Sequence, residues 1–465
     1  MIRINIKHIF VLAGFIGSFL SCQDLKFGDD FLEKAPSNDV DIDVIYSNAQ
    51  YARTALWSAY ATLHYGLNLG NQGNQLMGSD PLDCLTDLVY SNVWTDGVSG
   101  AAIHYNGTYS ADYENNGYSS KYSYYQRPCW LGIRRAWLFI ENVDRVPDMK
   151  EAEKQRLKAE AKVIIAMHYC DLFRHYGGVP IVDHAYTANE DMQKERGTVQ
   201  ETLDFIVNLL DEAADVLPWA MSAAENREWE GRLTKASAMG LKARILLFAA
   251  SPLFNGNEDF RDVVNKDGTP LFSQSKDNSK WERAAKAAKL VIDMPEYDLY
   301  KEYLDDGSID ALMSCINLFL TTPTNNKEII LAYPGKTNGL YEYHLLPRGS
   351  GWAGCISATQ NVVDAFFMKN GLSIDAPGSG YVESGYSGAD TYYDTKYLYG
   401  SSEKKAGLVT TAGTYNMYVN REPRFYANIR FHGEYCSFDD TKRTHNFLNE
   451  GKDGKPSHDS PIAGY

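Results

Sequence analysis

The sequence has no cluster of basic residues. It carries 45 lysines and arginines against 60 aspartates and glutamates, which gives a formal net charge of −15 at pH 7. Nucleic-acid binding depends on a basic surface that neutralises phosphates. The composition therefore argues against a nucleic acid as a partner, and equally against electrostatic attraction to an anionic lipid surface.

The chain also lacks an apolar run of transmembrane length. The segment IFVLAGFIGSFL at residues 9–20 is uncharged, but it is shorter than the ~20 residues that span a bilayer. Arg3 and Lys7 precede it, and a basic start before a short apolar run is typical of a secretory signal. We predict that residues 1–21 are a signal peptide and that the polar, acidic residues 22–42 form a tether.

Cys22 follows the small residue Ser21 directly after this segment. That order resembles a bacterial lipoprotein signal, in which the cysteine is acylated, for example with palmitate, and becomes the new N-terminus. The resemblance predicts lipidation at Cys22 and a membrane contact through acyl chains. The alternative is an ordinary cleaved signal with a coincidental cysteine.

No C-x-x-C motif occurs among the seven cysteines. Six of them lie beyond Cys22 and are widely scattered, which excludes both a zinc pattern and a small disulfide framework. Buried thiols are the expectation, although an exported protein could pair some of them. These residues are Cys84, Cys129, Cys170, Cys315, Cys355 and Cys436.

Apolar residues at helical spacing dominate the first part of the chain. One stripe contains Ala159, Val163 and Ala166, and Gly177-Gly178 ends it. Thr198 and Glu201 form a capping-box pattern at the start of another helix. The predicted helices cover residues 43–67, 130–146, 159–173, 198–217, 236–250 and 281–292. Because short connections join them and alanines line their apolar faces, we predict a tetratricopeptide-like scaffold of helix pairs over residues 43–294.

The amino-acid composition changes after about residue 295, where Gly, Asn, Ser and Tyr become frequent. Residues 329–333 and 341–346 resemble short strands, and residues 359–368 resemble a helix. Long loops on a rigid scaffold are typical of binding proteins. The expected fold is therefore mostly α, and residues 295–465 are expected to form an irregular, loop-rich ligand-binding part with short strands.

Tyrosine is the compositional outlier, at 32 residues. It concentrates in residues 90–125 and 381–418. A tyrosine ring offers a flat apolar face and a hydroxyl at low entropic cost, which suits recognition surfaces. Tyrosine also packs well in strands and loops, so both interpretations stay open.

Patterns for catalysis are weak. Gly97-Val-Ser-Gly-Ala and Gly385-Tyr-Ser-Gly-Ala fail the glycine spacing of a nucleophile elbow, and residues 349–354 match G-x-G-x-x-G outside a βαβ unit. His168 and His175 lack H-E-x-x-H spacing. A glycosidase needs two carboxylates at a fixed separation, which spacing in one sequence cannot show. No catalytic residue, cofactor or metal site is predicted.

Several segments together resemble the SusD/RagB family. In order they are FLEKAP, LKAEAKVIIAMHYCDLFRHYGGVPIV, GRLTKASAMGLKARILLFAASPLFN, WERAAKAAKLVID, ISATQNVVDAFFMKNGLSI and NREPRFYANI, and they span about residues 22–430. The resemblance implies a lipid-anchored outer-membrane protein facing the exterior. It also implies a SusC-like TonB-dependent transporter as partner, and capture of oligosaccharides without cleavage. Family chains continue past a region like SPIAGY into a further helix, so a C-terminal helical element is expected to be missing from this sequence.

Two loops supply the residues that a sugar requires, namely a flat aromatic face for the C–H side of the ring and forked polar groups for its hydroxyls. Their positions are similar to those of the binding loops in the family. Loop packing remains the alternative role for each aromatic residue, and peptide capture, a glycoside hydrolase and a lid without its own ligand remain alternative functions. The predicted ligand-binding residues are Tyr90, Asn92 and Trp94 in the first loop, and Tyr341, Tyr343, Arg348 and Trp352 in the second.

Overall fold

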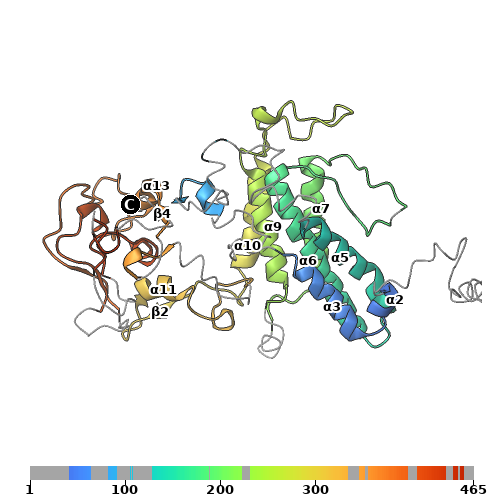
Figure 1. Ribbon diagram of the computed structural model, residues 1–465, viewed down its shortest axis with the longest axis horizontal. Helices are drawn as coiled ribbons and strands as arrows, with labels where there is room; N and C mark the ends of the chain where they lie inside the picture. The colour runs from blue at the N-terminus through green and yellow to red at the C-terminus, as the bar shows by residue number, and fades with distance from the viewer. Residues whose placement is uncertain are drawn as a thin grey trace, which may run out of the picture.

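The computed structural model describes residues 41–63, 82–91, 105, 107, 128–187, 189–221, 231–332, 345–350, 354–395, 406–435, 444–448 and 451–454. Within these ranges the chain is mostly helical, which confirms the predicted fold class. A group of long helices lies beside a part built of loops, short helices and short strands (Figure 1).

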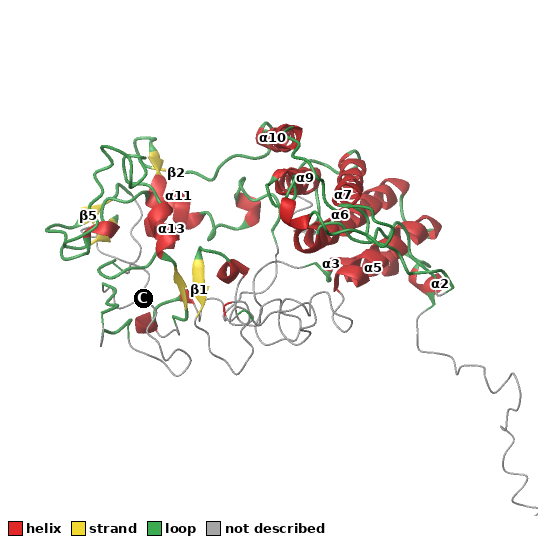
Figure 2. Ribbon diagram, turned by 90° about the horizontal axis from the view of Figure 1, so that it is seen from above, coloured by secondary structure: helices red, strands yellow, loops and turns green. Residues whose placement is uncertain are grey.

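The long helices form an array in which each packs against its neighbour in the sequence: α3 on α5, α5 on α6, α6 on α7, α7 on α9 and α9 on α10. Seen from above, α10 lies at one edge of the array (Figure 2). Their bounds are α2 (Ile42–Ile45), α3 (Ala49–Tyr60), α5 (Pro128–Asn142), α6 (Glu151–Tyr176), α7 (Val199–Ala214), α9 (Lys235–Ala250) and α10 (Ser279–Ile292).

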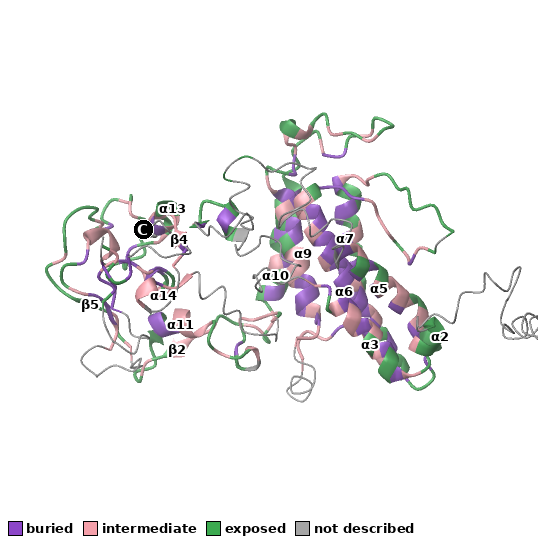
Figure 3. Ribbon diagram, in the orientation of Figure 1, coloured by how far each residue is buried: buried purple, intermediate pink, exposed green. Residues whose placement is uncertain are grey.

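Helix α6 follows the predicted pattern. Ala159, Val163 and Ala166 are all buried in the continuous core of the array, which Figure 3 shows as the purple faces of the helices. The helix ends where Gly177 takes a φ of 73°, a conformation that glycine adopts without steric penalty. Helix α7 then begins with the predicted capping box, in which the Glu201 amide donates to Thr198 Oγ1 at 3.1 Å and the Thr198 amide donates to Glu201 Oε2 at 2.7 Å.

Two local predictions were wrong. The helix expected over residues 43–67 is interrupted after Ile45, because the Asn48 side chain accepts a hydrogen bond from the Tyr51 amide at 2.9 Å and starts α3 anew. Residues 329–332 form no strand, whereas most of the strand expected at residues 341–346 lies outside the described part of the chain. Ile330 instead packs against α9, where it lies 3.6 Å from the position that a Cβ on Gly240 would occupy.

The second part has its own small core around Phe425 and Phe431. Within the described residues its strands form two-stranded pairs, β1 with β4, β2 with β3 and β5 with β6, all antiparallel. The elements are β1 (Val89–Ser91), β2 (Glu302–Tyr303), β3 (Ile309–Asp310), α11 (Ala311–Asn317), β4 (Ile356–Ala358), α13 (Gln360–Ala365), β5 (Thr391–Tyr392), β6 (Leu408–Thr410) and α14 (Pro423–Asn428).

Arg421, from the segment NREPRFYANI, links separate segments of this second part. Its side chain is fully buried, and its guanidinium donates to the carbonyls of Phe366 at 2.7 Å and Met417 at 2.9 Å, and to that of Val363. These carbonyls lie in and just after α13 and in the turn before α14. Arg421 therefore ties α13 to the chain that leads into α14.

Candidate functional site

Two segments that lie far apart in the sequence meet as a pair of strands. In β1 and β4 the register places Val89 opposite Ala358, Tyr90 opposite Ser357 and Ser91 opposite Ile356. Although β1 precedes the long helices α5 to α10 in the chain, it lies with the second part (Figures 1 and 2). The pairing joins the flanks of the two loops that the sequence selects for ligand binding.

Thr359 extends this connection. Its amide donates to the Leu88 carbonyl at 3.0 Å, and its hydroxyl donates to the Asp87 carbonyl. The same hydroxyl accepts from the Val362 amide at 3.4 Å and so caps α13. The segment before α13 is thus held to residues 87–91 by a short, local network of main-chain and hydroxyl contacts.

A stacked pair of tyrosines marks the surface beside β1. The rings of Tyr90 and Tyr105 have centroids 4.9 Å apart and planes 12° apart. Their exposed fractions are 52% and 39%. The Tyr105 hydroxyl donates to the Cys84 carbonyl at 2.6 Å and accepts from the Ser91 amide at 3.2 Å. Because Tyr105 is anchored by its hydroxyl, it holds the Tyr90 ring in one orientation and leaves aromatic surface open to solvent.

Arg348 is the described member of the second loop, at the start of the short 3₁₀ turn Arg348–Ser350. Its Cγ lies 3.8 Å from the position of a Cβ on Gly354, which has a φ of 60° and leads into β4. Within the described residues, Nη1 of Arg348 is buried and has no hydrogen-bond partner. It is a buried donor whose hydrogen-bonding capacity the described residues leave unsatisfied.

Two of the predicted residues are therefore described: Tyr90 lies within β1, and Arg348 lies in the segment before β4. Tyr105 was not among the predicted residues, although it lies in the tyrosine-rich stretch at residues 90–125. The remaining predicted residues lie outside the described part of the chain: Cys22, Asn92, Trp94, Tyr341, Tyr343 and Trp352.

Three residues from the weak catalytic patterns, His168, His175 and Ser387, make local structural contacts. His168 is buried, with Nε2 2.9 Å from the Thr62 hydroxyl, and Nδ1 of His175 lies 2.6 Å from the Asp171 carbonyl one turn earlier. Ser387 lies in a turn, where its hydroxyl donates to the Ala389 carbonyl at 2.6 Å. Among the described residues there is no group of three potential metal ligands. Nor does any described helix have the length and apolar character to cross a membrane.

Two family models match the chain. One, described as starch-binding and associating with the outer membrane, matches residues 30–247, and the other, described as the SusD family, matches residues 324–464. A search of curated proteins found no match.

Solved structures share the fold. BT4246 has a TM-score of 0.57 at 24% identity, with 83% of this chain and 66% of that chain covered. The SusD-like protein BF3747 from Bacteroides fragilis NCTC 9343 has a TM-score of 0.57 at 21% identity, with coverage of 86% and 64%. The SusD-like carbohydrate-binding protein BF0978 from the same organism has a TM-score of 0.52 at 18% identity, with coverage of 76% and 62%.

The chain thus spans about two thirds of the length of these solved structures. The two models together match the helical array except α10 and most of the loop-rich part, in the order that the family resemblance predicts. The chain belongs to the SusD/RagB family.

Proposed function

We propose that this protein captures oligosaccharides or polysaccharides at the outer membrane without cleaving them. The observation that carries the proposal is the β1–β4 pair with the Tyr90–Tyr105 stack beside it. Exposed aromatic surface suits the C–H side of a sugar ring, and a guanidinium such as that of Arg348 suits its oxygens. Further support comes from the starch-binding description of one matching family model and the carbohydrate-binding description of BF0978.

The proposed site consists of Tyr90, Tyr105 and Arg348, completed by residues from the same two loops. On this proposal Asn92 and Trp94 extend the first loop, and Tyr341, Tyr343 and Trp352 extend the second.

The test is migration of the purified protein in native gels that contain single polysaccharides. We expect at least one polysaccharide to retard the protein relative to a non-binding protein of similar size. Incubation with that polysaccharide should release no new reducing ends. If no polysaccharide of a broad panel retards the protein and calorimetry detects peptide binding, peptide capture would replace glycan capture as the function. Time-dependent release of reducing ends would indicate a hydrolase.

We also propose that Cys22 is lipidated and that the protein delivers its ligand to a SusC-like TonB-dependent transporter. Residues 22–42 would act as the tether between the lipid anchor and the folded part. Cys22→Ala should release the protein from membranes into the soluble fraction, and the wild-type protein should co-purify with a transporter after mild detergent extraction. Firm membrane attachment of the variant would contradict the anchor.

A further inference from the structure

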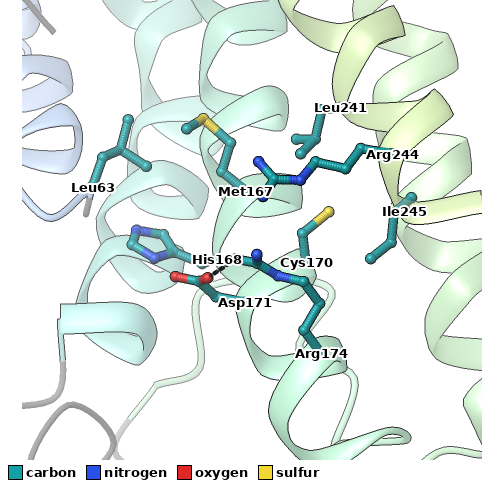
Figure 4. A pocket seen from close by; sticks show the side chains of 9 residues that line it. All are labelled: Leu63, Met167, His168, Cys170, Asp171, Arg174, Leu241, Arg244 and Ile245. Atoms are coloured by element: carbon teal, nitrogen blue, oxygen red, sulfur yellow. Dashed lines mark hydrogen bonds and ion pairs between the residues drawn. The ribbon is translucent and has the colours of Figure 1, made fainter. Parts of the chain in front are cut away.

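A cavity of about 140 Å³ lies in the helical array, away from the β1–β4 pair. Helix α6 supplies Met167, Cys170 and Arg174 to its lining, and α9 supplies Leu241 and Arg244 (Figure 4). Both helices belong to the packed array, so their side chains start from fixed backbone positions. An engineered cavity of about 150 Å³ holds benzene, so this one has room for a six-membered ring.

The charges around the cavity are unbalanced. Arg174 forms an ion pair with Asp171 one turn away on α6, and Nε of Arg174 is buried without a hydrogen-bond partner within the described residues. Arg244 reaches from α9 towards α6 over the cavity (Figure 4). Among the lining residues that the structure describes, Asp171 offsets the charge of Arg174 and Arg244 adds a charge of about +1, which favours a monoanion.

The other walls are mostly apolar. Met167, Leu241 and Ile245 line the sides, and His168, whose Nε2 lies 2.9 Å from the Thr62 hydroxyl, is the remaining polar side chain of the lining. Burial raises the pKa of the Cys170 thiol well above its ordinary value, so this side chain is a neutral thiol. It therefore acts as a small apolar wall and not as a thiolate.

We propose that this cavity binds a carboxylate carried on a six-membered ring, of the hexuronate type. The planar guanidinium of Arg244 matches the two oxygens of a carboxylate. The apolar walls face the C–H side of the ring. The choice of a sugar acid among ring carboxylates rests on the proposed function, whereas the carboxylate site itself does not.

The experiment is titration calorimetry of the full chain with D-glucuronate, benzoate, D-glucose and inorganic phosphate. We expect D-glucuronate to bind more tightly than D-glucose or phosphate. Arg244→Gln should raise the Kd for D-glucuronate about tenfold or more, as expected for the loss of a charge-assisted hydrogen bond. Arg244 is exposed, so the variant should fold. Arg261→Gln removes the same charge from an exposed arginine outside the cavity, paired with Glu258, and should leave the Kd unchanged.

The outcomes separate this proposal from the glycan-capture proposal. Tyr90→Ala should leave D-glucuronate binding unchanged if the ligand occupies the cavity. If benzoate binds more tightly than D-glucuronate, the cavity is a carboxylate site but its ligand is not a sugar acid. Equal binding of D-glucose and D-glucuronate, tighter binding of phosphate, or an unchanged Kd in Arg244→Gln would overturn the proposal.

Discussion

Glu160 is a fully buried carboxylate of the helical array. It lies on α6 with no exposed surface. Its carboxylate accepts from the Tyr60 hydroxyl at 2.8 Å and from Arg232 Nε at 3.1 Å, and it forms a second contact with Nη2 of Arg232. The Tyr60 hydroxyl in turn accepts from the Leu233 amide at 3.2 Å. One carboxylate therefore joins α3, α6 and the chain that enters α9.

Replacing this carboxylate removes the buried anion with which Arg232 and Arg156 are both paired. The side chain of Arg232 is only 12% exposed, and removing one partner of a buried pair costs about 3–5 kcal/mol. We expect Glu160→Ala to lower the free energy of unfolding by about that amount. Glu160→Gln keeps the shape and an acceptor for Tyr60 and loses the charge, so we expect about 1.5–3 kcal/mol, the worth of a hydrogen bond to a charged group.

The assay is urea unfolding followed by far-UV circular dichroism, with Glu212→Ala as the matched control. Glu212 also forms an ion pair with a residue of α6, Lys162, at 2.6 Å, but its side chain is 59% exposed. A surface pair of this kind is worth at most about 1 kcal/mol. Equal losses in Glu160→Ala and Glu212→Ala would refute the reasoning that burial makes the difference.

Two further predictions concern stability. Burial raises the pKa of Glu434 above its ordinary value of 4.5, so the folded state holds this proton more firmly than the unfolded state. The resulting stabilisation is complete below pH 4.5 and is lost as the pH rises through the raised pKa. In urea unfolding at stepped pH, wild type should therefore lose stability relative to Glu434→Gln as the pH rises above 4.5, and the opposite slope would contradict the assignment. A Cβ on Gly178 would lie 2.0 Å from the Gly197 carbonyl oxygen. Gly178→Ala should thus cost about 1–3 kcal/mol or more, whereas Gly388→Ala, which meets no atom within 4 Å, should be nearly neutral in thermal unfolding.

The helical array was the most predictable part of the molecule, because its signals are local. The stripe of Ala159, Val163 and Ala166, the stop at Gly177 and the Thr198–Glu201 box each act within a few residues of the chain. The failed strand at residues 329–332 shows the limit. A short apolar run can pack in either conformation, and here Ile330 packs against α9 while Leu331 is exposed.

The candidate site depends on contacts that no local pattern encodes. Composition pointed to the tyrosine-rich stretch, but the pairing of Tyr90 with Ser357 joins segments separated by most of the chain. Tyr105 is positioned by the Cys84 carbonyl and the Ser91 amide, which are main-chain groups without a sequence signature. The cavity likewise forms only when Arg174 and Arg244 come together from two helices.

The central claim is that a sugar ring binds against the Tyr90–Tyr105 stack, and the Kd of Tyr90→Ala for a gel-retarding glycan tests it most directly. Covering about 50 Å² of aromatic surface is worth ~1.3 kcal/mol at ~25 cal/mol per Å², or about tenfold in Kd. Tyr51→Ala on α3 is the matched control, since Tyr51 is also 52% exposed and lies away from β1. We predict that calorimetry gives a Kd about tenfold higher for Tyr90→Ala and unchanged for Tyr51→Ala. Equal affinities for both variants and the wild type would contradict the claim.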